Sequence, residues 1–160
     1  MKAPVALIPF ALACAVAYAA AVSSPQIRMT PEEADAVHAH DAGAGTSGVA
    51  GIRTTVVAGD PTAAGPYTIR LSIPANTRIQ AHTHRDDRTA VVAGGVWYFG
   101  YGSVADAAVE KALPPGSFYT EPAGVAHFAQ TKAERVTLYI TGTGPTDTLY
   151  IKAADTPAGR

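Results

Sequence analysis

The residues best suited to chemistry in this sequence are three histidines in two short stretches. His82 and His84 are separated by one residue, and His127 follows much later, after a turn rich in proline and glycine. In an extended strand, side chains at i and i+2 point to the same side, so we expect Gln80, His82 and His84 to share a face. Imidazoles that converge from two strands are typical ligands of divalent transition metals. The sequence therefore predicts a metal site formed by His82, His84 and His127.

Short β-rich runs must position these histidines. Helical periodicity disappears after Gly51, and residues 66–74 alternate between apolar and polar types, as a half-buried strand does. The predicted strands cover residues 52–57, 66–74, 78–84, 89–93, 96–101, 109–113, 117–120, 126–131, 135–141 and 148–152. None of these strands is separated from the next by a helix long enough for a parallel crossover. The pattern predicts an all-β sandwich or small barrel.

The residues before and after the β-rich region predict three further segments. Residues 1–21 carry a single charge, an apolar run and Ala-Tyr-Ala at 17–19, which is typical of a cleaved secretory signal peptide. Residues 22–50 are predicted to form a polar linker and a short helix. The helix is indicated by Thr30, which can cap its start, by Pro31, which suits its first position, and by Glu33, which completes a capping box. Residues 51–154 form the β-domain, and residues 155–160 form a C-terminal tail.

The signal peptide predicts a periplasmic or secreted protein. A buried N-terminal helix and a lipoprotein cleavage box at residues 11–14 are the alternatives. Cys14 is the only cysteine and lies inside this segment, so the cleaved chain would have no disulfide. Charged residues make up 16% of the chain and the net charge is −1, so the electrostatic footprint of a nucleic-acid-binding protein is absent. We also expect no membrane association after cleavage.

The two histidine stretches resemble the two sequence motifs of the cupin superfamily. In the first motif His82, His84 and Gly95 fit, whereas Asn76 stands in place of a glycine and Arg88 in place of a glutamate. The residues that fit the second motif are Gly116, Pro122, Gly124 and His127, and Thr131 stands in place of its asparagine. The resemblance covers residues 51–152. It implies a cupin-like double-stranded β-helix, or jelly-roll barrel, with the histidines as metal ligands.

Arg88 stands at the position where the resemblance implies a glutamate as the fourth metal ligand. A guanidinium has only donors and a permanent positive charge, so it cannot coordinate a metal ion. If Arg88 points inward, the pocket carries uncompensated positive charge and should favour an anionic oxygen ligand, such as a carboxylate or enolate. If Arg88 points outward, it pairs with Asp86 or Asp87 in the turn after His84. Both orientations stay open from the sequence.

Two residues of the strand before the Pro/Gly turn are further candidates. Tyr119 and Glu121 share one face of this strand, and Phe118 and Thr120 share the other. If the first pair faces inward, Glu121 could replace the missing carboxylate or act as a general base beside the metal. The alternative is a rim residue that stabilises the turn. The candidate catalytic residues are therefore Arg88, Glu121 and Tyr119.

Other residues with reactive or aromatic side chains have simpler interpretations. His38 and His40 diverge at a helical pitch, so they are poor co-ligands and we expect them on the surface. Trp97, Phe99 and Tyr101 alternate with Val96 and Tyr98, and one of these two sets should line the barrel as core.

Together these patterns predict an exported single-domain cupin that binds a divalent metal through three histidines. The expected activity is that of a dioxygenase or isomerase acting on a small, oxygen-bearing anion. Zinc, iron and manganese rank equally, because an all-nitrogen ligand set does not separate them. The alternatives are structural histidines without a metal, and a non-catalytic module that senses or binds a ligand or metal. Pairing through edge strands makes a homodimer the natural expectation.

Overall fold

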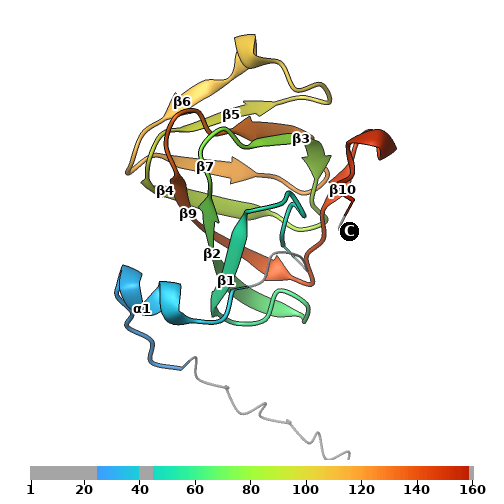
Figure 1. The fold of residues 1–160 in the computed structure, drawn as a ribbon. Helices are drawn as coiled ribbons and strands as arrows, with labels where there is room; N and C mark the ends of the chain where they lie inside the picture. The colour runs from blue at the N-terminus through green and yellow to red at the C-terminus, as the bar shows by residue number, and fades with distance from the viewer. Residues whose placement is uncertain (1–24, 40–44, 159–160) are drawn as a thin grey trace, which may run out of the picture.

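Two five-stranded antiparallel sheets face each other in this computed structural model, which describes residues 25–39 and 45–158 (Figure 1). The first sheet has the order β1-β2-β9-β4-β7 and the second the order β10-β3-β8-β5-β6. The strands of the first sheet are β1 (Arg53–Ala58), β2 (Gly65–Ile73), β9 (Val136–Gly144), β4 (Arg88–Gly94) and β7 (Phe118–Glu121). Those of the second are β10 (Leu149–Tyr150), β3 (Arg78–Thr83), β8 (His127–Gln130), β5 (Trp97–Tyr101) and β6 (Lys111–Leu113). The all-β jelly-roll prediction is confirmed.

Each predicted strand overlaps an observed one, with small differences at the ends. The largest difference is at residues 109–113, where a 3₁₀ turn, η1 (Ala107–Val109), precedes the short strand β6. A second 3₁₀ turn, η2 (Ala153–Asp155), follows the last strand. The predicted signal peptide, residues 1–21, lies outside the described residues, as does His40.

The predicted short helix is α1 (Pro31–Ala36), which packs beside β1 at one end of the first sheet (Figure 1). Its capping box is formed as expected: the Thr30 hydroxyl accepts from the Glu33 amide at 3.2 Å, and the Glu33 carboxylate accepts from the Thr30 amide at 2.7 Å. These bonds satisfy amides that would otherwise lack partners at the start of the helix. Within the part of the chain that is described, no helix is long and apolar enough to cross a membrane.

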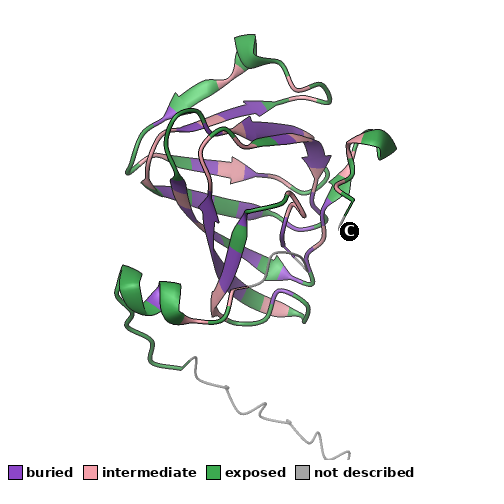
Figure 2. Cartoon of the chain, in the orientation of Figure 1, coloured by how far each residue is buried: buried purple, intermediate pink, exposed green. Residues whose placement is uncertain are grey.

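The core lies between the sheets, where the inward faces of β2, β4 and β9 supply most of its side chains and strands β3, β5, β6 and β8 of the second sheet supply others. Strands β2 and β9 pair along their whole length, and the register places Ile69 opposite Ile140 and Leu71 opposite Leu138. Buried and more exposed residues alternate along β9 and β4, as Figure 2 shows on the ribbon. Burial of such side chains contributes about 25 cal/mol for each Å² of apolar surface removed from water. The first sheet therefore contributes most of the apolar surface that is buried between the two sheets.

A β-bulge in β3 corrects one expectation about the histidine strand. The register between β3 and β8 shifts between Ile79 and His82, so simple alternation is broken there. As a result Ile79, and not Gln80, lines the inside of the barrel together with His82 and His84. The prediction that Gln80 shares the histidine face is wrong, because a sequence pattern does not reveal a bulge.

Asn76, at the position where the cupin motif has glycine, adopts left-handed backbone geometry with φ of 55°. We expect Asn76→Val to lower the free energy of unfolding by about 1–2 kcal/mol relative to Asn76→Gly, because a β-branched side chain crowds the backbone at positive φ. Urea denaturation of the two variants measures this difference. Equal stabilities for the valine and glycine variants would contradict the backbone assignment.

Candidate metal centre

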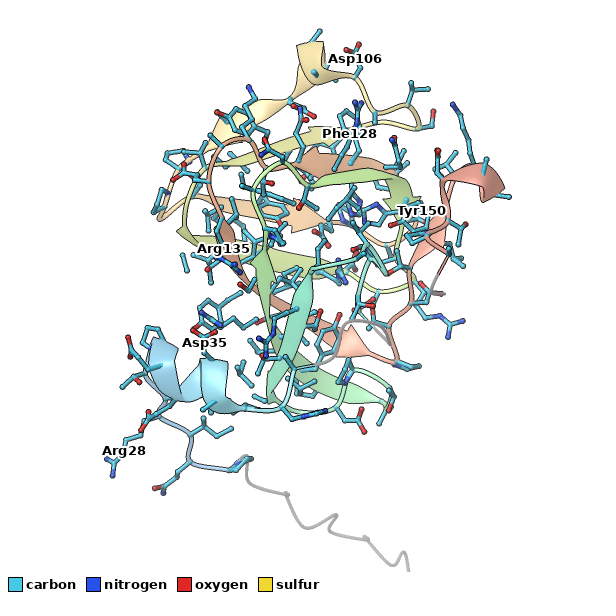
Figure 3. All side chains as sticks on the ribbon, in the orientation of Figure 1. Arg28, Asp35, Asp106, Phe128, Arg135 and Tyr150 are labelled. Atoms are coloured by element: carbon cyan, nitrogen blue, oxygen red, sulfur yellow. The ribbon has the colours of Figure 1, made fainter. Side chains whose placement is uncertain are left out.

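Two rows of paired residues, one in each sheet, bring the candidate residues together. In the second sheet His82 on β3 lies opposite His127 on β8, and His84 follows β3 directly. In the first sheet Arg88 on β4 lies opposite Glu121 on β7. The two rows converge on one cavity, which is lined by residues of both. The labelled Tyr150, which pairs with His82, marks this end of the second sheet in Figure 3.

The three histidines form one compact buried cluster. Their ring centroids are separated by 4.9 Å for His82 and His84, 4.4 Å for His82 and His127, and 5.1 Å for His84 and His127. Each ring offers one nitrogen, and these three nitrogens all lie within 4.8 Å of one another. That spacing allows all three to reach a single ion with modest side-chain movement, since metal–nitrogen bonds are about 2.0–2.1 Å. The predicted convergence of His82, His84 and His127 is confirmed.

Backbone carbonyl groups fix the tautomer of all three imidazoles. The Nδ1 atoms contact the carbonyl oxygens of three residues: Gln80 at 2.7 Å from His82, Asp147 at 2.5 Å from His84, and Val125 at 3.0 Å from His127. A carbonyl oxygen only accepts, so Nδ1 carries the proton in each ring and donates it. The Nε2 atom of each neutral ring is then left with a lone pair. This is the tautomer in which histidine binds a metal ion through Nε2.

Arg88 points into the barrel, where it joins Glu121 to the histidine cluster. Its Nε donates to the Glu121 carboxylate at 2.6 Å, and its Nη2 contacts the same oxygen. The Arg88 Nη2 also lies 2.6 Å from the Nε2 of His84, to which it donates. Arg88 and Glu121 are both 4% exposed. A direct cross-strand pair of opposite charges therefore stands beside the imidazoles.

The alternative in which Arg88 points outward and pairs with Asp86 or Asp87 is wrong. Both of these acidic residues form hydrogen bonds with other partners. The carboxylate of Asp86 is buried and accepts hydrogen bonds from the hydroxyl groups of Tyr67 and Thr146, at 2.8 Å and 2.5 Å. The Asp87 carboxylate accepts from the amide of Ala123 at 2.8 Å. Both acidic residues thus stabilise the turns around the site and leave Arg88 free to face inward.

Burial and neighbouring charges set the ionisation of the cluster. Burial, followed by the proximity of His127, lowers the pKa of His82 to about 3. Burial together with Arg88 lowers the pKa of His84 to about 2, and burial lowers the pKa of His127 as well. Burial alone would raise the pKa of Glu121, but Arg88 outweighs it and lowers the pKa to about 2. At neutral pH the site therefore holds three neutral imidazoles, a carboxylate and a guanidinium.

These groups fit a divalent cation. Glu121 Oε2 lies 3.7 Å from His84 Nε2 and 3.8 Å from His127 Nε2, so three acceptor atoms face one another. Acceptors at this spacing repel unless a donor or cation lies between them. Arg88 partly fulfils this need at His84, but His127 Nε2 is buried without a hydrogen-bond partner. Glu121 thus offers, from the neighbouring strand, the carboxylate that the first cupin motif would have at residue 88.

The cavity in front of the cluster is small and holds further unpartnered polar atoms. Its volume is about 30 Å³, and the indole Nε1 of Trp97 and the hydroxyl of Tyr119 are buried at its wall without hydrogen-bond partners. Burial, with Glu121 nearby, holds the pKa of Tyr119 well above its usual value, so this hydroxyl keeps its proton. A water needs roughly 10–15 Å³, so the cavity has room for an ion with one or two small ligand atoms.

The aromatic strand β5 contributes to this wall as expected. Trp97 and Phe99 are buried and line the cavity, whereas Tyr101 is 49% exposed and its hydroxyl donates to the carbonyl of Thr120 at 2.6 Å. On β7, Tyr119 faces inward and Phe118 outward. The structure thus shows which face of β5 and which face of β7 points into the barrel, and the sequence had left both questions open.

Sequence reasoning missed one segment of the site, residues 45–49. Gly45 and Ser47 line the cavity, although they lie in the region expected to be linker. The Tyr150 hydroxyl donates to the Ser47 carbonyl at 2.7 Å, and the Thr148 hydroxyl donates to the Thr46 carbonyl at 2.8 Å. Backbone groups make these contacts, so side-chain patterns carried no signal. His38, by contrast, is exposed and lies outside the histidine cluster, as expected.

Comparisons with solved structures place this fold among the cupins. The polyketide cyclase RemF from Streptomyces resistomycificus matches over 81% of this chain and 90% of its own, with a TM-score of 0.64 and 14% identity. A cupin-superfamily sugar phosphate isomerase from Silicibacter pomeroyi matches over 72% of this chain and 78% of its own, with a TM-score of 0.54 and 14% identity.

Structures of DMSP lyases match at a TM-score of 0.50 and 16% identity, over 59% of this chain but only 48% of the lyase chain. No protein-family model and no curated protein sequence matches the chain. At these identities the likeness shows the fold, and the fold of this chain is that of a cupin.

Proposed function

We propose that this cupin-fold chain is a metal-dependent enzyme that acts on a small, oxygen-bearing anion. The observation that carries the proposal is the set of three Nε2 lone pairs that converge beside the Glu121 carboxylate, with His127 Nε2 buried and without a hydrogen-bond partner. Zinc, iron or manganese all suit this mixture of imidazole and carboxylate ligands. His82, His84 and His127 would hold the ion, and Glu121 would serve as the fourth ligand.

A bound divalent ion supplies Lewis acidity toward an oxygen of the substrate, and the protein supplies the rest of the site. Arg88, buried beside Glu121, offers guanidinium donors to a carboxylate or enolate oxygen. The Trp97 N–H and the protonated Tyr119 hydroxyl both lack partners and offer two more donors from the apolar wall. These donors favour a ligand that carries several oxygen atoms and negative charge.

The chemistry best supported is an isomerisation, or an oxygenation of an enolate-type substrate. With the ion held by the three histidines alone, the ionised Glu121 carboxylate at the cavity would be the proton acceptor, and its pKa of about 2 would make it a weak base. Solved neighbours of this fold include an isomerase, a cyclase and lyases, which supports enzymatic use of such a barrel. The small cavity admits only the reacting end of the ligand.

A non-catalytic ligand-binding module is the second candidate, and one contact favours it. The guanidinium of Arg88 already donates to His84 Nε2 and to Glu121, so an internal cation satisfies part of the acceptor set. In such a module the histidines would be structural and the protein would bind an anion without a metal.

Metal analysis of the purified protein separates the two candidates. We expect close to one ion per chain after mild purification, and a loss of metal affinity beyond about a hundredfold in His82→Ala and His127→Ala, because a direct ligand is removed. The matched control is His38→Ala, which should keep full affinity, since His38 is exposed and outside the cluster. Iron with oxygen uptake in the presence of small carboxylates or diketones supports the enzyme.

The result that would contradict the enzyme is specific. A wild-type protein that binds neither Zn²⁺, Fe²⁺ nor Mn²⁺ at neutral pH, yet still binds small carboxylates, would support the non-catalytic module.

We also propose that the chain is exported and pairs into a homodimer. The signal-like residues 1–21 support export, and the open strand edges of β6 and β7 support pairing. N-terminal sequencing of secreted or periplasmic protein should begin close to residue 22, whereas a sequence that starts at Met1 would contradict cleavage.

A further inference from the structure

We propose that the outer face of the first sheet carries a second, metal-independent site for a dianionic oxyanion, such as a phosphate or sulfate group. The site is a groove of about 270 Å³ between α1 and strands β1, β2 and β9. It is lined by three arginines, three hydroxyl residues and one carboxylate: Arg53, Arg70, Arg135, Thr55, Ser72, Thr137 and Asp35.

Strand pairing explains why these side chains share a face. Arg53 on β1 lies opposite Ser72 on β2, which in turn lies opposite Thr137 on β9. Residues alternate between the faces of a strand, so Arg70 and Ser72 point away from the cavity that their neighbour Leu71 lines. The groove and the histidine cluster are therefore on opposite sides of the same sheet.

The charges of the groove are unbalanced. Arg70 pairs with Asp35 of α1 at 2.5 Å, and this is the only ion pair of the three arginines among the described residues. Arg135 Nη1 donates instead to the Ser72 hydroxyl at 2.7 Å, which holds this guanidinium over the groove. The groove thus carries three positive charges and one negative charge. Figure 3 shows Arg135 and Asp35 on the same side of the barrel.

A buried donor without a partner points to the ligand. The Arg70 side chain is 8% exposed, and its Nε is buried with no hydrogen-bond acceptor. A buried donor that lacks an acceptor is costly, and an arginine fork matches the oxygen atoms of phosphate and sulfate. A tetrahedral dianion would neutralise the two excess positive charges of the groove. It would also accept hydrogen bonds from guanidinium and hydroxyl donors together. Asp35 occupies one of these donors, so the ligand competes with this carboxylate.

Calorimetry with inorganic phosphate and with sulfate, at constant ionic strength set by chloride, tests the site in the full-length protein. We expect binding of at least one of these anions, weakened about tenfold or more in Arg53→Gln and in Arg135→Gln. Arg78→Gln removes the same charge from an exposed position on β3 and should leave the affinity unchanged. Asp35→Asn should strengthen binding severalfold, because it removes the competing carboxylate.

The same titration separates this site from the metal centre. We expect equal anion affinity in wild type, in His82→Ala and in protein treated with chelator, because the groove shares no residue with the histidine cavity. Loss of anion binding in His82→Ala would overturn the proposal, since the anion would then bind at the metal. Unchanged affinity in the Arg53→Gln/Arg135→Gln double variant, or no binding of either anion to wild type, would overturn it as well.

Discussion

Replacing Arg88 by methionine should raise the affinity for Zn²⁺ by at least about a hundredfold, and lower the stability of the metal-free protein by about 3–5 kcal/mol. Without the guanidinium, Glu121 becomes a buried carboxylate without its partner, and His84 Nε2 loses its donor. A bound metal ion then interacts with both the Glu121 carboxylate and His84 Nε2. The folding stability that the metal-free variant loses is therefore recovered when Zn²⁺ binds, which increases the affinity for Zn²⁺. Competition titration with a chelator, and urea unfolding with and without Zn²⁺, measure the two effects.

A double variant provides the control for this prediction. In Arg88→Met/Glu121→Met both charges are replaced by apolar groups of similar volume, so we expect near wild-type stability without metal but no gain in Zn²⁺ affinity. Arg88→Glu, which restores the carboxylate where the cupin motif has it, should also bind Zn²⁺ more tightly than wild type. Unchanged affinity in both Arg88→Met and Arg88→Glu would show that Arg88 and the ion do not compete.

Acidification should destabilise the metal-free protein steeply, beginning near pH 6.5. The pKa of His82 is lowered to about 3 and that of His84 to about 2, while an unfolded histidine has a pKa near 6.5. Between these values the unfolded chain binds protons that the folded chain excludes, so stability falls as pH falls. The slope is on the order of 1 kcal/mol per pH unit for each buried histidine. Below pH 4.5 Glu121, whose pKa is lowered to about 2, adds to the loss.

Chemical denaturation in chelator at a series of pH values measures this slope. His82→Asn should flatten the profile between pH 6.5 and 4.5, because one buried titrating group is removed. His38→Asn, at an exposed histidine outside the cluster, is the matched control for the loss of one histidine from the chain. A stability that stays constant from pH 6.5 to 4.5 would mean that the imidazoles are protonated as readily in the folded state as in the unfolded state.

Local patterns in the sequence were sufficient for the strands and for helix α1. Alternation at residues 66–74 reports a half-buried strand, and Thr30 with Glu33 reports a helix start, because both signals arise from neighbours along the chain. The bulge in β3 was not predictable, since it depends on pairing with β8 rather than on the residues of β3 alone. Gln80 was therefore assigned to the wrong face.

For the site, residue type and spacing predicted the three histidines but not their surroundings. The partnership of Arg88 and Glu121 depends on the register of β4 with β7, which brings together residues far apart in sequence. The orientation of Arg88 likewise depends on Tyr67, Thr146 and Ala123, which take the two neighbouring aspartates as partners. Such long-range pairings leave no mark in a single sequence. The catalytic roles of Arg88, Glu121 and Tyr119 stay predictions.

The main-chain contacts of the three imidazoles have a consequence for how this barrel can diverge. Because a carbonyl oxygen of the backbone holds Nδ1 of every ring, we expect all three imidazoles to keep their orientation when nearby side chains are exchanged. Substitutions around the cluster can therefore change substrate selectivity while the three Nε2 atoms still point toward one another. We therefore expect new activities in descendants of this chain to arise through substitutions at Arg88, Trp97 and Tyr119, which face the cavity. The three histidines of the cluster should stay in place.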